Sequence, residues 1–179
     1  LRTHGFSGTC IPFPLWFDEL HFQPTDLTRR DDLLAKMDPH APKENTKPLI
    51  LGYAGSLFPE KGIDDLLDAL ALIPDWKQRI ALYIVGRGDW QSSLEKKVNL
   101  RRQEGWRVYM PGPLPAQDMP TFYSLCDVLV VPSRTASHWK EQFGRVIVEA
   151  EACGCTAVGS NSGAIPEVIG DQARVFREC

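Results

Sequence analysis

Two carboxylates that stand eight residues apart, Glu141 and Glu149, could hold two parts of one extended polar ligand. In a helix this spacing would place them roughly 12 Å apart along the axis. Gly144 would then lie in the first turn, where backbone amides lack partners and the helix dipole is positive, so a phosphate could approach closely. The stretch therefore predicts a diphosphate cradle between two acids, with about the span of a nucleotide sugar from ribose to hexose.

The same two acids also have an ordinary explanation. Glu141 fits a simple acid in the first turn of a helix, and Glu149 fits a solvated charge beside Glu151. Spacing alone does not decide between the two interpretations.

The helix that would carry these acids follows an apolar, strand-like run at 128–132. Its apolar residues fall at i, i+3, i+4 and i+7, a spacing that forms one stripe on a helix: Phe143, Val146, Ile147 and Ala150. We therefore expect a helix that opens at Glu141 and packs this stripe on a sheet.

Two cationic residues are further candidates. Lys61 stands where a helix should begin, and the dipole disfavours a cation there unless an anion is near, although Glu60 could supply that charge. Arg87 lies between Gly86 and Gly88 after an apolar run, which suggests either close backbone approach to a ligand or a simple tight turn. The third glycine of a dinucleotide fingerprint is absent there, which disfavours a nicotinamide cofactor.

Other kinds of site are not supported. The sequence has no P-loop, and its four histidines are dispersed, His138 alone being near the stretch 141–149. Cys153 and Cys155 lack the spacing and the histidines of a zinc site, and we expect them to be small buried residues between a helix and a strand. No metal site is expected.

From Pro48 onward, strand-like runs alternate with helical patterns, which is typical of a parallel sheet covered by helices. Strands are expected at 49–54, 80–85, 108–110, 128–131, 156–160 and 174–176, and helices at 63–70, 93–102, 118–125, from 141 onward and at 165–169. The predicted fold is α/β, a Rossmann-like parallel sheet with helices on both faces. Ligands of such sheets bind outside the carboxyl ends of the strands.

Residues 1–47 lack a regular period because prolines and charges interrupt them, and we expect an interdomain linker and surface wrap. Four aromatic residues there should pack against the domain formed by 48–179: Phe13, Trp16, Phe17 and Phe22. Because the chain starts at Leu1 and stops at Cys179 just after a strand-like run, we expect a fragment, truncated at both ends relative to a full enzyme.

Composition limits the partners and the compartment. The formal net charge of −3 does not indicate a nucleic-acid surface, and no apolar run reaches the length of a membrane helix, so membrane contact is not indicated. Five cysteines, an odd and scattered number, favour a reducing cytoplasm over a disulfide framework. For the full-length protein, the inner face of a membrane is an alternative location.

The run Glu141-Gln-Phe-Gly-Arg-Val-Ile-Val-Glu149-Ala-Glu-Ala-Cys153-Gly resembles the two-glutamate signature of retaining glycosyltransferases of the GT-B fold, family 4. The resemblance continues through Gly163-Ala-Ile-Pro-Glu167, Asp127-Val-Leu-Val-Val-Pro-Ser133, Gly55-Ser-Leu-Phe-Pro-Glu-Lys61-Gly62 and Val85-Gly86. It thus covers nearly the whole chain.

In that family two Rossmann-like domains face each other, and the carboxyl-terminal one binds the nucleotide sugar. The resemblance implies that this chain is the donor-binding half and needs a missing acceptor-binding domain. It also implies that Glu149 holds the ribose hydroxyls and Glu141 contacts the sugar of a UDP- or GDP-sugar, while the loop from Met110 to Leu114 borders the base. The diphosphate would be held by Lys61 and by the amides of Phe143, Gly144, Arg145 and Val146.

Glu141 and Lys61 are the candidate catalytic residues. As the glycosidic bond to phosphate breaks, Lys61 and the helix amides would stabilise the charge that grows on the nucleoside diphosphate. Neither a metal nor another cofactor is expected. Ser56 departs from the family, because many members have an arginine there, and Arg87 or Arg145 could replace it.

Two alternatives stay open. The Ser56 departure fits a non-catalytic relative that binds nucleotide sugars or acts as a scaffold. A GT-B nucleotide-sugar epimerase would share the fold and the nucleotide pocket. An isolated donor half would bind its ligand without transferring sugar.

Overall fold

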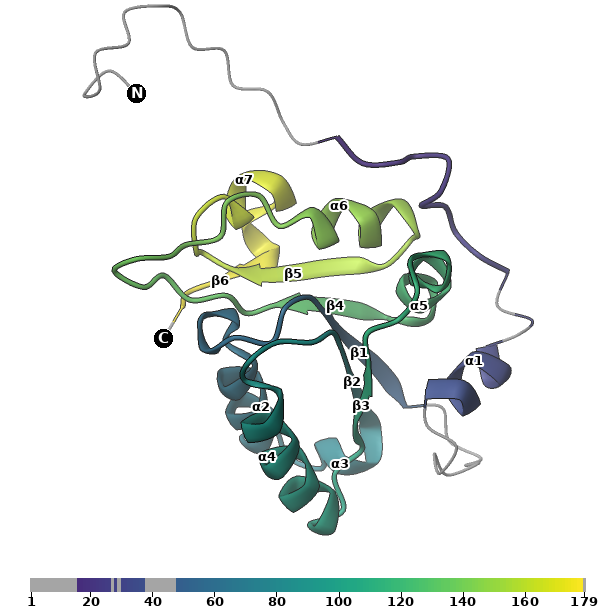
Figure 1. The fold of residues 1–179 in the computed structure, drawn as a ribbon, viewed down its shortest axis with the longest axis vertical. Coiled ribbons are helices and arrows are strands. Elements are labelled where there is room, and N and C mark those ends of the chain that lie inside the picture. Colours follow the sequence, from purple (N-terminus) through teal and green to yellow (C-terminus); the bar gives the residue numbers. More distant parts are fainter. Residues whose placement is uncertain (1–15, 27, 29, 38–47, 179) are drawn as a thin grey trace, which may run out of the picture.

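A six-stranded parallel sheet forms the centre of the structure, a computed structural model that describes residues 16–26, 28, 30–37 and 48–178 (Figure 1). The strands follow the order β3-β2-β1-β4-β5-β6. Their bounds are β1 (Leu49–Ala54), β2 (Ile80–Val85), β3 (Val108–Gly112), β4 (Val128–Val131), β5 (Thr156–Ser160) and β6 (Val175–Phe176). All neighbouring strands pair in parallel.

Helices connect the strands and cover both faces of the sheet (Figure 1). The α-helices are α1 (Arg30–Met37), α2 (Ile63–Ala71), α3 (Trp76–Arg79), α4 (Gln91–Gln103), α5 (Met119–Leu125), α6 (Arg145–Ala152) and α7 (Ile165–Ile169). Short 3-10 turns lie at η3 (Pro59–Lys61), η4 (Ala116–Asp118) and η5 (Gln172–Arg174).

The hydrophobic core lies in two clusters, one on each face. Successive residues of a strand point to opposite faces, so β1 sends Ile50 into one cluster and Leu51 into the other. Helices α2, α3 and α4 pack on the Leu51 side, and α1, α5, α6 and α7 pack on the Ile50 side. These two layers of helices confirm the predicted α/β fold.

The order of the strands creates a switch point between β1 and β4. From β1 the chain moves outward to β2 and β3, then returns across the sheet to β4 and continues to β5 and β6. The loops that follow β1 and β4 therefore leave the sheet toward opposite faces, and in sheets of this kind ligands bind outside the carboxyl ends of the strands at this point.

The six predicted strands are confirmed, four of them with the same bounds. The predicted start of α6 at Glu141 was wrong. This helix begins at Arg145, four residues after Glu141, so Glu141 and Phe143 lie in the preceding loop. Gly144 is the N-cap, with the left-handed φ of 77° that an L side chain rarely adopts. The expected distance of about 12 Å between Glu141 and Glu149 along one helix therefore does not apply. Of the four residues in the predicted apolar stripe, Ile147 and Ala150 are the buried residues of α6.

The amino-terminal stretch differs from the prediction in two respects. Helix α1 was not predicted, and its Met37 joins the core. Phe22 packs against the core as expected and Phe17 is half-buried, but Trp16 is 75% exposed, so its predicted packing was wrong. Phe13 lies outside the described residues.

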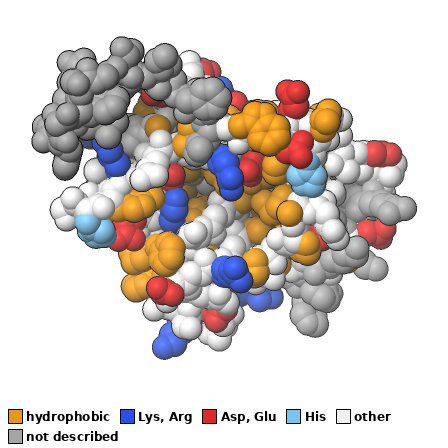
Figure 2. Space-filling view, turned by 45° about the horizontal axis from the view of Figure 1, so that its top comes forward, with side chains coloured by type: hydrophobic (Ala, Val, Ile, Leu, Met, Phe, Trp, Pro, Cys, Tyr) orange, Lys and Arg blue, Asp and Glu red, His pale blue; other side chains and the backbone are white. Residues whose placement is uncertain are grey.

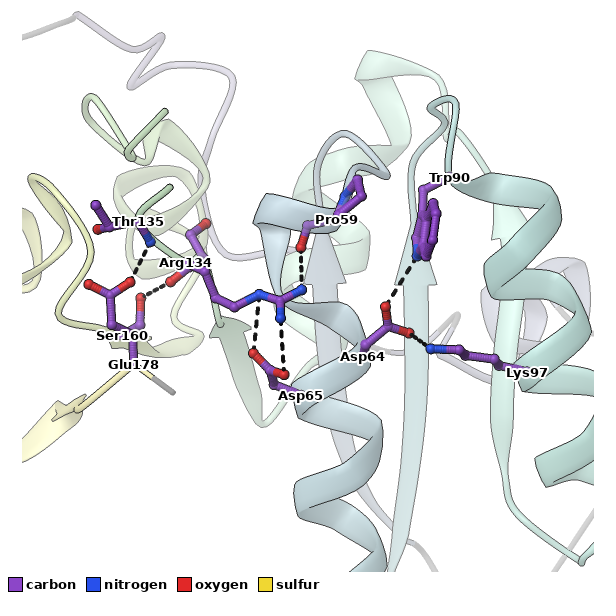
Figure 3. A network of polar contacts seen from close by, with 10 residues as sticks. Pro59, Asp64, Asp65, Trp90, Lys97, Arg134, Thr135, Ser160 and Glu178 are labelled. Atoms are coloured by element: carbon purple, nitrogen blue, oxygen red, sulfur yellow. Dashed lines mark hydrogen bonds and ion pairs between the residues drawn. The ribbon is translucent and has the colours of Figure 1, made fainter. Parts of the chain in front are cut away.

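A network of polar contacts ties the loop after β4 to the start of α2 (Figure 3). The Arg134 guanidinium donates to the Pro59 carbonyl at 2.7 Å, and its Nε lies 3.3 Å from Asp65 Oδ2. The Arg134 amide donates to the Glu60 carbonyl at 2.7 Å. The loop 132–140 is thereby fixed beside Lys61, the last residue of η3.

Replacing Arg134 by methionine should lower the free energy of unfolding by about 1–2 kcal/mol, because the guanidinium bonds are lost while the apolar stem is kept. Thermal unfolding should show a melting temperature that is a few degrees lower. The exposed Arg79 at the end of α3 offers a matched control, and Arg79→Met should leave the melting temperature unchanged. Equal effects of the two substitutions would contradict the anchoring role of Arg134.

Candidate functional site

A pocket of about 300 Å³ lies at the carboxyl ends of β1 and β2, beside the switch point. Its lining comes from the loops after β1, β2 and β3 and from α5 and α6: Ala54, Gly55, Ser56, Val85, Gly86, Arg87, Pro113, Leu114, Met119, Tyr123, Val146 and Glu149. On the face of the molecule in Figure 2, hydrophobic side chains gather in the middle and charged side chains lie among and around them. The lining is mostly apolar and includes the polar side chains of Ser56, Arg87, Tyr123 and Glu149, a composition that ligand sites usually have.

The loops that follow β1 and β2 lie in close contact at one end of this pocket, because Gly86 has no side chain that would separate them. A Cβ on Gly86 would lie 1.8 Å from the Gly55 carbonyl oxygen, and the φ of Gly86 is 149°. The Leu57 amide then donates to the Arg87 carbonyl at 3.0 Å. Ser56 and Arg87 are thereby held on adjoining loops of the same pocket.

Glu149 brings a negative charge to the pocket from α6. Its side chain is 13% exposed, and its Oε2 accepts a hydrogen bond of 2.9 Å from the hydroxyl of Tyr123 on α5. Its Oε1 lies 3.6 Å from Nε of Arg145, whose side chain is 64% exposed. Burial raises the pKa of Tyr123, and the Glu149 charge raises it further, so the phenol stays protonated and acts as the donor.

Lys61 and Glu141 form a second polar centre. Lys61 Nζ donates to Glu141 Oε2 at 2.7 Å, and the same oxygen accepts a bond of 3.2 Å from the hydroxyl of the fully buried Ser133. The ammonium also lies 4.7 Å from the ring centroid of Trp139. The pair is largely buried, which strengthens the attraction between its charges relative to water.

The predicted site residues divide between these two centres and their surroundings. The pocket lining includes five of them: Ser56, Arg87, Leu114, Val146 and Glu149. Lys61 and Glu141 form their own ion pair, while Phe143 and Gly144 lie in the loop before α6. The exposed Arg145 side chain and Met110, which packs against the core beneath α2 and α4, do not line the pocket.

No role was predicted from the sequence for Tyr123, Met119 or Ser133. Tyr123 and Met119 belong to α5, whose helical pattern was predicted but whose face toward the pocket was not. Ser133 lies two residues after the end of β4, a position that could have suggested a side chain at the carboxyl edge of the sheet.

The buried cysteines do not belong to the site. Cys153 and Cys155 lie between the end of α6 and the start of β5, which confirms their predicted place. Burial raises the pKa of Cys153 to about 11 and that of Cys155 to about 12. Among the residues that the structure describes, no three His, Cys, Asp or Glu side chains are grouped so that they could hold a metal. Nor does any helix in the described ranges have the length and apolar character needed to cross a membrane.

A parallel sheet of this strand order, with helices on both faces, defines a Rossmann-like domain. The family model described as "Glycosyl transferases group 1" matches residues 36–176. The chain therefore belongs to this family.

Individual relatives agree with this assignment. The chain is 36% identical over 125 residues to O-antigen chain mannosyltransferase B of Escherichia coli, a match that covers 69% of this chain and 31% of that protein. It is 35% identical over 120 residues to the GDP-mannose-dependent alpha-(1-6)-phosphatidylinositol monomannoside mannosyltransferase of Mycolicibacterium smegmatis, covering 64% of this chain and 30% of that protein. The chain thus spans about a third of the length of these curated relatives.

The fold is shared with solved structures of other proteins. Alr3699/HepE of Anabaena, crystallised in complex with UDP and glucose, matches with a TM-score of 0.69 at 24% sequence identity. The match covers 90% of this chain and 41% of that one. This likeness supports the prediction that the chain has the architecture of one half of a GT-B fold.

Proposed function

We propose that this chain is the donor-binding half of a retaining glycosyltransferase and that its pocket binds a nucleoside-diphosphate sugar. The observation that carries the proposal is the carboxylate of Glu149, which lines a pocket beside the switch point and comes from the helix whose amino-terminal amides are nearby. A carboxylate in this position can accept hydrogen bonds from the ribose hydroxyls. The full-length protein would transfer a hexosyl group to a hydroxyl acceptor.

The donor is proposed to be a UDP- or GDP-sugar. The Anabaena structure contains UDP and glucose, and the M. smegmatis relative is named as GDP-mannose-dependent. Pro113, Leu114 and Met119 form an apolar part of the pocket lining, which suits the flat face of a base.

The diphosphate is proposed to lie between Lys61 and the first amides of α6. Lys61 carries the positive charge, and the amides of Arg145 and Val146 have no partner within the helix. Arg87 is the better candidate to replace the arginine that many family members have in place of Ser56, because Arg87 lines the pocket and Arg145 does not. These groups would supply the positive charge that the diphosphate needs, and we propose that the reaction needs no metal.

During transfer, the acceptor oxygen bonds to the anomeric carbon while the bond from that carbon to the phosphate oxygen breaks. The electron pair of that bond remains on the phosphate oxygen, and this oxygen accepts the proton that the acceptor hydroxyl loses. Lys61 and the helix amides would stabilise the growing negative charge. Glu141 is proposed to contact the sugar, and the acceptor would be bound by a domain outside this chain.

The donor site can be tested by calorimetric titration of the chain with UDP, GDP and ADP and with their sugars. Saturable binding of UDP or GDP, with weaker binding of ADP, is expected. A folded chain that binds none of the uridine or guanosine nucleotides would contradict the proposal. The fold is checked in the same samples by circular dichroism.

Product analysis of the full-length protein tests the transfer itself against the two alternatives. A sugar joined to an acceptor, with release of nucleoside diphosphate, identifies a transferase. A changed sugar that is still attached to its nucleotide identifies an epimerase. Binding without either product identifies a non-catalytic relative, for which the serine at position 56 would be the first residue to replace with arginine.

A further inference from the structure

The carboxylate of Glu149 accepts one hydrogen bond from the protein core, donated by the Tyr123 hydroxyl. Tyr123 donates to Oε2 at 2.9 Å, whereas Arg145 Nε, at 3.6 Å from Oε1, is beyond hydrogen-bonding distance and belongs to an exposed side chain. An ionised carboxylate has about four lone-pair sites, so the Tyr123 bond leaves capacity on both oxygens. Glu149 can therefore accept further hydrogen bonds while Tyr123 holds it.

Tyr123 itself has little freedom to move. Its side chain is fully buried in α5, and its ring packs at centroid distances of 5.8 Å from Phe122 and 6.1 Å from Phe22. A buried ring in a close-packed core keeps one orientation. Its hydroxyl, which stays protonated, therefore supplies a fixed donor that faces the pocket from the core side.

Without this bond, Glu149 would have another partner. Arg145 stands one helical turn before Glu149 on α6, and its guanidinium is free to move in solvent because its side chain is 64% exposed. A carboxylate released by Tyr123 would turn toward this cation. The direction of the Glu149 side chain thus depends on a competition between a buried phenol and an exposed guanidinium.

We infer that Tyr123 is a positioning residue whose hydroxyl fixes the Glu149 carboxylate in the orientation that accepts the ribose hydroxyls. The inference rests on the proposed function, in which Glu149 binds ribose. It assigns recognition of the ribose hydroxyls to Glu149 on α6 together with Tyr123 on α5.

The test compares UDP and GDP with their 2′,3′-dideoxy counterparts, which lack the ribose hydroxyls. In Tyr123→Phe, affinity for the ribonucleotide should fall by about tenfold, because a Glu149 carboxylate that turns toward Arg145 must first return to the orientation that accepts the ribose hydroxyls. Affinity for the dideoxynucleotide should change by less than about twofold, because the phenylalanine ring keeps the volume of the pocket wall. Calorimetry with all four nucleotides measures both values.

Tyr53→Phe is the matched control. Tyr53 is also buried and its hydroxyl donates to a carbonyl of the pocket, that of Ser56, at 2.7 Å. Removing this hydroxyl should leave the ratio of ribonucleotide to dideoxynucleotide affinity unchanged. The control therefore separates loss of a buried hydroxyl in general from loss of the contact to Glu149.

The possible failures are distinguishable. If the wild-type chain does not prefer the ribonucleotide, the proposed role of Glu149 fails, and the role of Tyr123 fails with it. If the preference is present and Glu149→Ala removes it while Tyr123→Phe keeps it, the inference about Tyr123 alone is overturned. Equal losses of both nucleotides in Tyr123→Phe would show that the hydroxyl only supports the pocket, which also overturns the inference.

Discussion

Glu149→Ala is expected to weaken binding of the preferred nucleoside diphosphate by about 100-fold or more, because two hydrogen bonds from ribose to a charged acceptor would be lost. The carboxylate is 13% exposed, so bulk water cannot fully replace it as an acceptor. The substitution also leaves the buried hydroxyl of Tyr123 without the acceptor it has in the structure. Calorimetric titration with UDP and GDP measures the loss.

Glu151→Ala gives a control in the same helix. Glu151 forms an ion pair with Arg174, which also donates to the carbonyl of Ile169, and it does not line the pocket. Its removal should lower the melting temperature and leave nucleotide affinity within about twofold of the wild type, since it touches no proposed ligand group. A similar loss of affinity in both variants would show that α6 needs its acids for folding rather than for ribose.

The sheet could be predicted from local sequence because its strands are short apolar runs bounded by turn residues. Most residues of β1 to β5 are buried between the helices of the two faces, which accounts for the apolar composition of these strands. The alternation of strands and helices then implied that the strands pair in parallel and that a ligand would bind at their carboxyl ends.

The start of α6 could not be predicted in the same way, because it depends on one backbone conformation. Gly144 adopts a positive φ and turns the chain just before the helix, so Glu141 faces Lys61 and Ser133 instead of joining the helical stripe. Helix α1 is weakly amphipathic and α3 has only four residues, which explains why their patterns gave no signal.

Contacts between segments that are distant in the sequence could not be predicted from local sequence patterns either. Tyr123 meets Glu149 across two elements, and Arg134 fixes the loop after β4 against the start of α2. Neither contact follows from periodicity, since each depends on how helices and loops are placed after the sheet has formed. The resemblance to a family pointed to Glu141 and Glu149 as candidate site residues, but not to the side chains that contact them.

Lys61→Ala should also cause a large loss of nucleotide affinity. The difference between its effects on diphosphates and on nucleosides is more informative than the size of the loss. Affinity for UDP or GDP should fall by about 30- to 100-fold, because the proposed diphosphate loses its cation and meets the remaining charge of Glu141, whose side chain is 12% exposed. Binding of uridine or guanosine, which carry no phosphate, should change little. Amide chemical shifts can follow the weak binding of these nucleosides.

The repulsion from Glu141 can be separated from the loss of the cation. In Lys61→Ala combined with Glu141→Gln, part of the lost diphosphate affinity should return, because the unpaired buried charge is removed. Lys97→Ala is the control, since Lys97 pairs with Asp64 at 2.6 Å but is 53% exposed on α4. If Lys61→Ala weakened nucleosides and diphosphates equally, Lys61 would act on the shape of the pocket, and the assignment of the diphosphate to the Lys61 side of α6 would be wrong.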